Sequence, residues 1–384
     1  MKIKVFEKFL KRVAKDLIFY NVKKRKEKKK ALLLYSTQPF FPFCKPHHTN
    51  NLEIISIVDS LSDFGFCVDV AFYDSRRRLH YSKYDLIIGF GDSYTRSLGK
   101  CKKGSIKIYL STGSYFLEAN KNEIERWRQV YRNKPLFISN DRIELTSNPL
   151  NTFRSIFFSD AIFCDGGQWA METFSFVNRP VFYLGAIAFQ RFSFQDFHRN
   201  LSESKKNFIC MVGKGFVHKG VDLILEAFAH LEDLNLFIIG SPEKGFLEAF
   251  ENEFSLKNVH FLGFLDPNSN SFFEICQKCS FSINASCSEG CSTSVLTTMG
   301  AGIVPILSER EGVEADDFGI LLDNISADEI EKKVLWSSSL KDEDVFERSK
   351  KAWLKVSSSY RKENYAENFR KAISNLLESK LSNN

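Results

Sequence analysis

The sequence predicts an α/β protein with two domains, each built on a parallel β-sheet with helices on both faces. The 384 residues are enough for two separate hydrophobic cores. Short apolar runs alternate with amphipathic stretches along the chain, which is the pattern of repeated strand–helix units. A polar stretch without periodicity at 192–206 interrupts this alternation, which then restarts. We therefore expect the first domain at 31–195 and the second at 206–365.

In the first half, the apolar run ALLLYS at 31–36 predicts a first buried strand. An amphipathic stretch that starts at NNLEII predicts a helix that stops at Gly65. Further short apolar runs predict strands at CVDVAFY (67–73), YDLIIGFG (84–91), IKIYLS (106–111) and AIFCDGG (161–167).

In the second half the same alternation predicts five strands, NFICMVGK (207–214), NLFIIG (235–240), NVHFLGF (258–264), SFSINAS (280–286) and GIVPILS (302–308). Helices are expected between them at 220–231, 244–253, 271–278 and 293–299. The stretch 345–384 also has a helical pattern.

The charge is concentrated at the N-terminus. Residues 1–30 hold thirteen lysines and arginines against three acidic residues, a net charge of +10, whereas the whole chain is only +6. The remaining residues are therefore slightly acidic, and we expect no nucleic-acid partner. Within 1–30, apolar residues recur at spacings of three and four, at Ile3, Phe6, Leu10, Val13, Leu17 and Tyr20. This predicts a basic amphipathic helix that lies on an anionic membrane surface; the alternative is a solvated helix packed on the body.

The location is predicted from what the sequence lacks. No run is long enough for a membrane span, and no signal-peptide core is present. Nine cysteines, an odd number, indicate reduced thiols. We expect a cytoplasmic protein, peripheral on the inner face of the plasma membrane.

The stretch SEGCSTSVLTTMGAGIVP (288–305) places a carboxylate and many small residues before a short predicted helix. In open α/β sheets, ligands bind beyond the carboxyl ends of strands, where helix N-termini present free N–H groups. The amides near Thr293 and Ser294 therefore predict an anion site with Glu289 beside it. Upstream, Lys214 and Lys219 bracket a glycine-containing turn in VGKGFVHKGVD. A Lys-Gly pair alone is common surface chemistry, but its position at a second strand end favours a phosphate-binding role.

These motifs resemble those of the group 1 (family 4) retaining glycosyltransferases. That family has a strand ending in VGR with Lys-Gly five residues on, then NV-F-G, then SEG opening a motif of two glutamates separated by seven residues, then A-G-PV. This sequence has MVGKGFVHKGVDLILEAF, NVHFLGF, ASCSEGCSTSVLTTMGAGIVPI and GILL in that order, between about 208 and 325. The first half matches by its alternation alone. The resemblance implies a GT-B fold, two Rossmann-like domains facing an interdomain cleft, with a C-terminal helix at 366–384 that returns to the first domain.

The resemblance also implies roles. Lys219 matches the lysine that binds the donor diphosphate, Lys214 stands where the family has arginine, and Glu289 matches the carboxylate that contacts the donor sugar. These three are the expected catalytic residues, acting without a metal or other cofactor on a nucleoside-diphosphate sugar. The expected donor-binding residues are Gly213, Gly263, Phe264, Gly290, Cys291, Ser292, Thr293, Ser294 and Thr297. Thr297 departs from the family, whose second glutamate binds the ribose hydroxyls at this position, so the donor's identity stays open.

The acceptor side gives weaker signals. His47 and His48 follow the first strand, and Thr112 and Ser114 follow IKIYLS at the same expected sheet edge. They are candidates for acceptor contacts; for the histidines, solvated loop positions are the alternative. The glycines of DGGQW (165–169) form a third loop there. The spacing of Cys276, Cys279, Cys287 and Cys291 raises the alternative of zinc, but one pair falls on a predicted helix and the other brackets the donor loop, so we expect no metal.

The function expected from these observations is transfer of a sugar, with retention, from a nucleoside-diphosphate sugar to a hydroxyl of a glycan or glycolipid acceptor. Assembly of lipopolysaccharide, capsule or another cell-surface glycan is the expected setting. One alternative is a catalytically silent nucleotide-sugar-binding or scaffold protein, and another is a sugar-nucleotide epimerase of the same fold.

Overall fold

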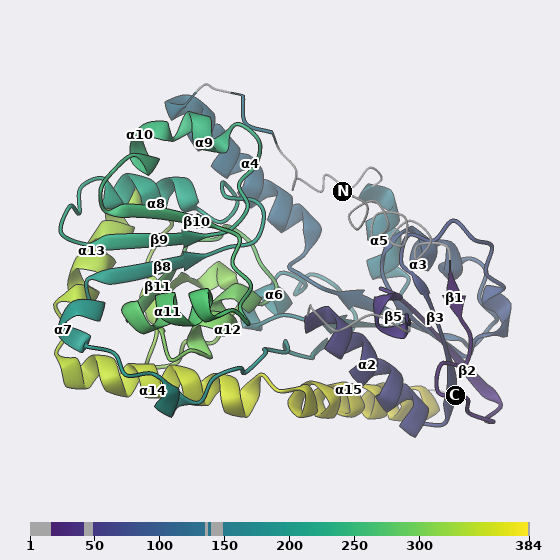
Figure 1. The fold of residues 1–384 in the computed structure, drawn as a ribbon. Coiled ribbons are helices and arrows are strands. Elements are labelled where there is room, and N and C mark those ends of the chain that lie inside the picture. Colours follow the sequence, from purple (N-terminus) through teal and green to yellow (C-terminus); the bar gives the residue numbers. More distant parts are fainter. Residues whose placement is uncertain (1–16, 42–48, 135–136, 140–148, 383–384) are drawn as a thin grey trace, which may run out of the picture.

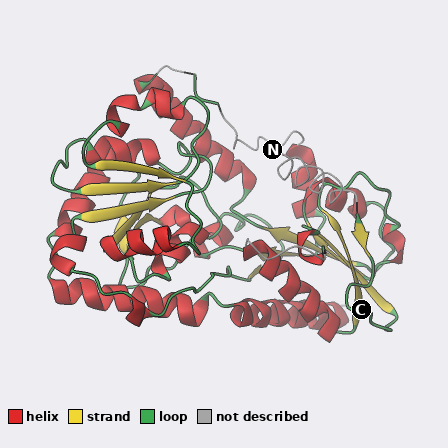
Figure 2. Cartoon of the chain, in the orientation of Figure 1, coloured by secondary structure: helices red, strands yellow, loops and turns green. Residues whose placement is uncertain are grey.

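The computed structural model describes residues 17–41, 49–134, 137–139 and 149–382 (Figure 1). Its strands form two separate sheets at opposite ends of an elongated molecule, each surrounded by helices (Figure 2). This confirms the predicted α/β class with two parallel sheets. Among the described helices, none combines the length and apolar character that crossing a membrane requires.

The first sheet has seven strands, and only the short edge strand β1 is antiparallel to its neighbour. In spatial order they are β1 (Ile18–Phe19), β3 (Phe66–Phe72), β2 (Lys29–Tyr35), β4 (Leu86–Gly89), β5 (Ile106–Ser111), β6 (Ala161–Cys164) and β7 (Val181–Tyr183). The helices of this half are α2 (Thr49–Asp63), α3 (Gly91–Leu98), α4 (Phe116–Asn133), α5 (Pro149–Phe157) and α6 (Gln168–Glu172).

The second sheet has six parallel strands. In spatial order they are β10 (Val259–Gly263), β9 (Asn235–Ile239), β8 (Asn207–Met211), β11 (Phe281–Asn284), β12 (Val304–Ser308) and β13 (Ile320–Leu322). Its helices are α7 (Leu201–Ser204), α8 (Val221–Phe228), α9 (Phe246–Ala249), α10 (Glu251–Phe254), α11 (Asn270–Lys278), α12 (Thr293–Met299) and α13 (Ala327–Ser338). All five strands predicted for this half are present.

The strand order of the second sheet reverses between β8 and β11. From β8 the chain continues to β9 and β10 on one side, and then crosses to β11, β12 and β13 on the other. The loops that follow β8 and β11 therefore start at the point of reversal on the carboxyl edge, which is where open α/β sheets bind ligands.

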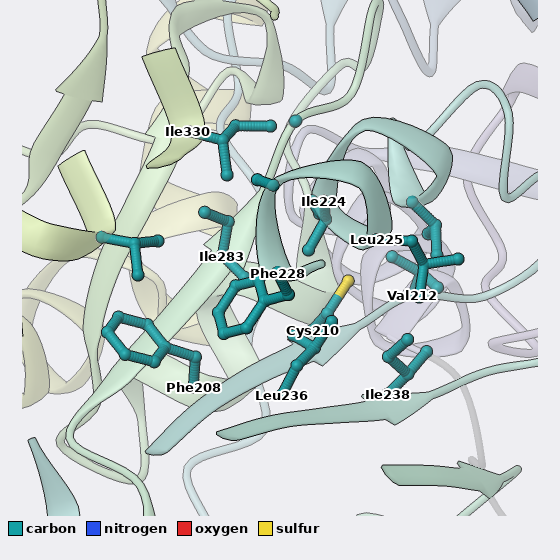
Figure 3. Close-up of a cluster of buried hydrophobic side chains, with 14 of the residues drawn as sticks. Phe208, Cys210, Val212, Ile224, Leu225, Phe228, Leu236, Ile238, Ile283 and Ile330 are labelled. Carbon is teal, nitrogen blue, oxygen red and sulfur yellow. The ribbon is translucent and has the colours of Figure 1, made fainter. Parts of the chain in front are cut away.

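Strand β8 lies at the centre of the second core because its sequence is apolar on both faces. Phe208 and Cys210 point to the side covered by α8, where Phe228 and Ile283 meet them (Figure 3). Ile209 points to the other side, toward α11. A strand covered on both faces has a continuous apolar run instead of an alternating one, which is why the sequence pattern predicted it.

Helix α4 follows β5 in the first sheet but packs on the second domain. Trp127 and Val130 belong to the same buried cluster as β8 and α8, and Figure 1 shows α4 beside α8 and α9. Lys134 donates to Glu253 of α10 at 2.7 Å. The two domains are thus tied by a helix from one that lies on the other.

The chain also returns in the opposite direction at its C-terminus. Helix α14 (Asp342–Ser359) lies along the second domain, and α15 (Lys362–Ser382) continues to the first domain (Figure 1). Tyr365, Phe369 and Ile373 of α15 pack in the first-domain core with residues of α2. The returning helix thus begins at Lys362, a few residues before the expected 366.

The N-terminal prediction needs a correction. Residues 1–16 of the expected basic helix lie outside the described residues, but its last part is wrong, because Ile18 and Phe19 form β1, paired with Ala71 and Val70 of β3. Phe19 packs on the first-domain core, and the pairing covers the outer edge of β3. The end of the expected segment 1–30 is also not helical, since β2 starts at Lys29.

Candidate functional site

The candidate site lies at the reversal point of the second sheet. The loop after β8 carries Lys214, His218 and Lys219, and the loop after β11 carries Glu289. Lys219 and Glu289 form an ion pair between Nζ and Oε1. The Lys219 side chain is 7% exposed and that of Glu289 13%, so the pair is largely shielded from water. The structure therefore places the lysine expected to bind the diphosphate directly beside the glutamate expected to contact the sugar.

His218 completes this cluster. Its Nε2 lies 2.9 Å from Oε1 of Glu289 and 2.6 Å from the carbonyl oxygen of Ser288. Its Nδ1 lies 2.9 Å from Oε2 of Glu123, a residue of α4. Both ring nitrogens therefore face acceptors, and the side chains of His218 and Glu123 are 5% and 9% exposed.

This geometry favours a protonated imidazole. Ionised carboxylates and carbonyls only accept hydrogen bonds, so beside them both His218 nitrogens act as donors. Burial lowers the pKa of His218, but hydrogen bonds to Cys287, Glu123 and Glu289 outweigh it, and the pKa is raised well above its usual range. Two cations, His218 and Lys219, then balance two carboxylates, Glu123 and Glu289.

Glu243, which follows β9, stabilises the turn that carries His218 and Lys219. Its carboxylate accepts from the amide of Phe216 at 2.8 Å. Gly220 ends the turn with a φ of +68°, and a Cβ there would meet the carbonyl oxygen and Cβ of Ala285. Glycine is needed at this position for both reasons. The sequence thus fixes the turn against the neighbouring strand end.

The loop after β11 is also packed against the first domain. The amide of Gly167 donates to the carbonyl of Gly290 at 3.0 Å. A Cβ on Gly290 would lie 2.9 Å from Cα of Gly113, and a Cβ on Gly167 would clash with the carbonyl of Gly312. The glycines of DGGQW therefore serve a close backbone contact between the domains, beyond their own turn.

Of the two acceptor-side candidates that the structure describes, Ser114 contacts this loop through its side chain. Its Oγ lies 2.7 Å from Oγ of Ser288, the residue before Glu289. Thr112 is exposed, and its carbonyl oxygen would lie 3.0 Å from a Cβ on Gly290. His47 and His48 lie outside the described residues.

Helix α12 begins beside this cluster, as expected. Ser292 is its N-cap residue but makes no side-chain cap; its Oγ lies 3.0 Å from Oγ of Ser294. Thr293 and Ser294 open the first turn. Thr297 donates its hydroxyl to the carbonyl of Thr293 at 2.6 Å, so its oxygen is left as an acceptor only. Cys291 packs against the hydrophobic cluster that contains Met299.

The remaining expected donor residues lie along the same sheet edge. The carbonyl of Gly213, after β8, accepts from the amide of Ser241, and the carbonyl of Gly263, at the end of β10, accepts from the amide of Gly240. Lys214 is exposed, in contrast to the buried Lys219. Phe264 is 74% exposed beside Gly263. The structure brings these strand ends together, and their roles stay predictions.

Sequence reasoning missed two members of the cluster. His218 directly precedes Lys219 in the motif VGKGFVHKGVD. The sequence alone does not indicate a role for it, because its partners come from distant parts of the chain. Glu123 had no sequence signal, because nothing local indicates that α4 lies against the second domain. Both became evident only from their distances.

The four cysteines considered as zinc ligands do not form one cluster. Cys276 and Cys279 lie in the core beside α11, whereas Cys287 lies 3.6 Å from Nδ1 of His218 and Cys291 packs by α12. Within the described ranges, no group of three or more histidine, cysteine or acidic residues is placed to hold a metal ion.

A second pair of buried carboxyl groups lies in the first domain, close to the interdomain contact. Glu53 of α2 accepts from the hydroxyl of Tyr35 at 3.2 Å, and Asp165 accepts from Tyr365 of α15 at 2.7 Å. Burial raises the pKa of Glu53 to about 7, and burial together with Glu53 holds the pKa of Asp165 well above its usual range. Two such groups cannot both ionise cheaply in a buried site.

Comparison with known families finds a match that covers the candidate site. The model of the family Glycosyl transferases group 1 matches residues 193–352, a span that contains β8 to β13 and both site loops. No curated protein matches the sequence.

Solved structures resemble the chain over most of its length at low identity. TarM from S. aureus, solved with fondaparinux, alpha-GlcNAc-glycerol and UDP, is 13% identical, with a TM-score of 0.54 over 78% of this chain and 56% of TarM. The chain thus spans little more than half of TarM. HepE from Anabaena, solved with UDP and glucose, is 12% identical, with a TM-score of 0.56 over 90% of this chain and 99% of HepE. WaaG, a glycosyltransferase involved in lipopolysaccharide biosynthesis, is 13% identical, with a TM-score of 0.54 over 88% and 98%.

Proposed function

We propose that this chain, which has the GT-B fold and matches the group 1 glycosyltransferase family model over residues 193–352, transfers a sugar from a nucleoside-diphosphate sugar to a hydroxyl acceptor. The observation that carries the proposal is the Lys219–Glu289 pair at the reversal point of the second sheet. A cation and a carboxylate side by side match a ligand with a diphosphate at one end and a sugar at the other.

Lys219 is suited to the diphosphate. A lysine ammonium has three N–H donors, so Lys219 can bind phosphate oxygens and still donate to Glu289. As the bond to the sugar breaks, negative charge grows on the leaving diphosphate, and a cation held in a buried site stabilises that charge strongly. Lys214, on the same loop and exposed, provides a second positive charge.

Glu289 is the group proposed to contact the sugar. The loop around it presents small residues, so that a sugar can approach the backbone closely. We propose retention of the anomeric configuration, with no metal or other cofactor, in keeping with the SEG and Lys-Gly motifs. Proton NMR of the product formed from an α-linked donor tests this directly, since an α-linked product supports retention and a β-linked product overturns it.

The acceptor is proposed to bind on the first-domain side of Ser114. A depression of about 480 Å³ lies between the start of α4 and α6 and is lined by Trp169, Phe176, Glu118 and Glu172, among others. Aromatic faces combined with carboxylates suit a sugar ring, which offers both apolar C–H faces and hydroxyls. Because WaaG acts in lipopolysaccharide biosynthesis, we propose a cell-surface glycan or glycolipid as the acceptor. Residues 1–30 are proposed to hold the enzyme on the anionic inner face of the membrane.

The proposal is tested with a panel of UDP-, GDP-, ADP- and TDP-sugars. Thermal shift gives binding, and release of the nucleoside diphosphate gives turnover or slow hydrolysis. We expect one nucleotide class to raise the melting temperature and one of its sugars to be turned over. Binding without turnover across the panel, with a lipid-linked or oligosaccharide acceptor present, would favour a silent binding protein. Conversion of the sugar nucleotide without an acceptor would favour an epimerase, and a flat panel overturns the proposal.

A further inference from the structure

The site cluster contains two residues that the proposed transfer does not use, His218 and Glu123. They form a buried chain of contacts, from Glu123 Oε2 to His218 Nδ1 at 2.9 Å and from His218 Nε2 to Glu289 Oε1 at 2.9 Å. Each end of the imidazole therefore touches one carboxylate. Since Glu123 belongs to α4, the chain connects Glu289 to a helix contributed by the first half of the sequence.

We propose that Glu123 and His218 are a positioning pair that holds the carboxylate of Glu289 toward the donor sugar. This rests on the proposed function and deepens it. The same oxygen of Glu289, Oε1, receives both His218 and Lys219. The carboxylate is thereby fixed at one oxygen by two cations.

Glu123 is needed because the imidazole alone would not stay in place. A buried cation requires partners for both of its N–H groups, and Glu123 satisfies the one that faces away from Glu289. It also fixes the ring orientation, since Nδ1 is tied to α4 while Nε2 is shared between Glu289 and the carbonyl of Ser288. An acid behind a histidine has this effect in other catalytic sites, where it orients the ring and stabilises its charged form.

The position of Glu123 on α4 gives the pair a further consequence. Helix α4 is anchored on the second domain at a second point, by Lys134 and Glu253. Glu289 is therefore correctly placed only while α4 is docked, so that the arrangement of the two halves of the chain controls the sugar-binding carboxylate. Both halves of the chain therefore contribute to the site, although Lys219 and Glu289, the residues expected to bind the donor, both lie in the second half.

The test separates positioning from general stability. Glu123→Gln keeps the shape and one acceptor oxygen but removes the charge, and Glu123→Ala removes both. The control is Lys134→Met, which breaks a different polar link between the same helix and the same domain, the one to Glu253. UDP and UDP-glucose serve as probes, UDP for binding at the diphosphate end and UDP-glucose for turnover.

If the pair positions Glu289, Glu123→Gln lowers kcat about tenfold and Glu123→Ala about a hundredfold, while the Kd for UDP changes less than twofold in both. Lys134→Met keeps kcat within about twofold. The double variant Glu123→Gln/His218→Asn loses no more than the worse single variant, because residues that act as one chain are not additive.

Two results would overturn the positioning role. One is unchanged kcat in Glu123→Ala. The other is a loss of UDP affinity equal to the loss of kcat, with the same loss in Lys134→Met, since this would mean that Glu123 only helps α4 to dock. A wild-type protein that neither binds UDP nor turns over UDP-glucose defeats the inference together with the underlying function for these donors, and it differs visibly from a defect confined to the variants.

Discussion

Arg126 of α4 and Asp222 of α8 form an ion pair, 2.5 Å from Nη2 to Oδ2, with side chains only 4% and 8% exposed. Arg126 Nε and Asp222 Oδ1 are both buried without a hydrogen-bond partner among the described residues. The ion pair is therefore shielded from solvent, and each of its two side chains keeps one polar atom without a hydrogen bond. Such a pair contributes little net stability as a whole, but losing one member leaves an unpaired buried charge.

The first prediction follows from this imbalance. Arg126→Leu should lower the free energy of unfolding by about 3–5 kcal/mol, because Asp222 is left buried alone. Urea denaturation followed by tryptophan fluorescence measures it. The double variant Arg126→Leu/Asp222→Leu should recover most of the loss, and a double variant as unstable as the single one would show that packing, and not charge, explains the effect.

The second prediction concerns Lys219. Lys219→Ala should reduce turnover of the donor by a hundredfold or more, about 2.7 kcal/mol of transition-state stabilisation. The matched control is Lys257→Ala, an exposed lysine before β10 at the opposite edge of the same sheet. Initial rates of nucleotide release for both variants decide the matter, and near-normal turnover in Lys219→Ala removes the residue from the mechanism.

The third prediction concerns Thr297, whose hydroxyl donates to the carbonyl of Thr293 and so offers only an acceptor to a ligand. A carboxylate at this position can accept from two neighbouring ribose hydroxyls, and charge-assisted bonds are worth about 1.5–3 kcal/mol each. Thr297→Glu should therefore tighten UDP binding about tenfold by calorimetry. Thr297→Gln, of equal length without the charge, should give a smaller gain, and weaker binding of Thr297→Glu would place the ribose elsewhere.

The fourth prediction concerns pH. Burial raises the pKa of Glu53 from 4.5 to about 7, so the folded state binds a proton that the unfolded state has already lost at intermediate pH. The cost of ionising Glu53 is fully present above about pH 7 and disappears as the pH falls toward 4.5. Glu53→Gln should therefore stabilise the protein at pH 8, on the order of 3 kcal/mol at most, and much less at pH 4.5.

Urea denaturation at the two pH values checks this, with Glu226→Gln, an exposed residue of α8, as the control. A gain in stability that is equal at both pH values, or larger at pH 4.5, would contradict the raised pKa of Glu53.

Much of the fold could be predicted because strands covered on both faces have continuous apolar sequences, as in β8 and β12. The loops with Lys219 and Glu289 could be predicted because they follow such strands. The two-residue strand β1 could not, since it depends on the free edge of β3. Nor could the docking of α4, whose buried Glu123 and Arg126 look like solvent-facing charges until their partners from another part of the chain are known.

The place of α4 bears on how the protein can be divided. Residues 193–352, the part that matches the group 1 glycosyltransferase family model, do not contain the helix that supplies Trp127 and Val130 to their core. Expressed as a fragment, this segment would expose an apolar groove that the intact chain covers. The span that matches the family model is thus shorter than the unit that folds independently. A truncation designed from that span alone would remove part of the hydrophobic core of the second domain.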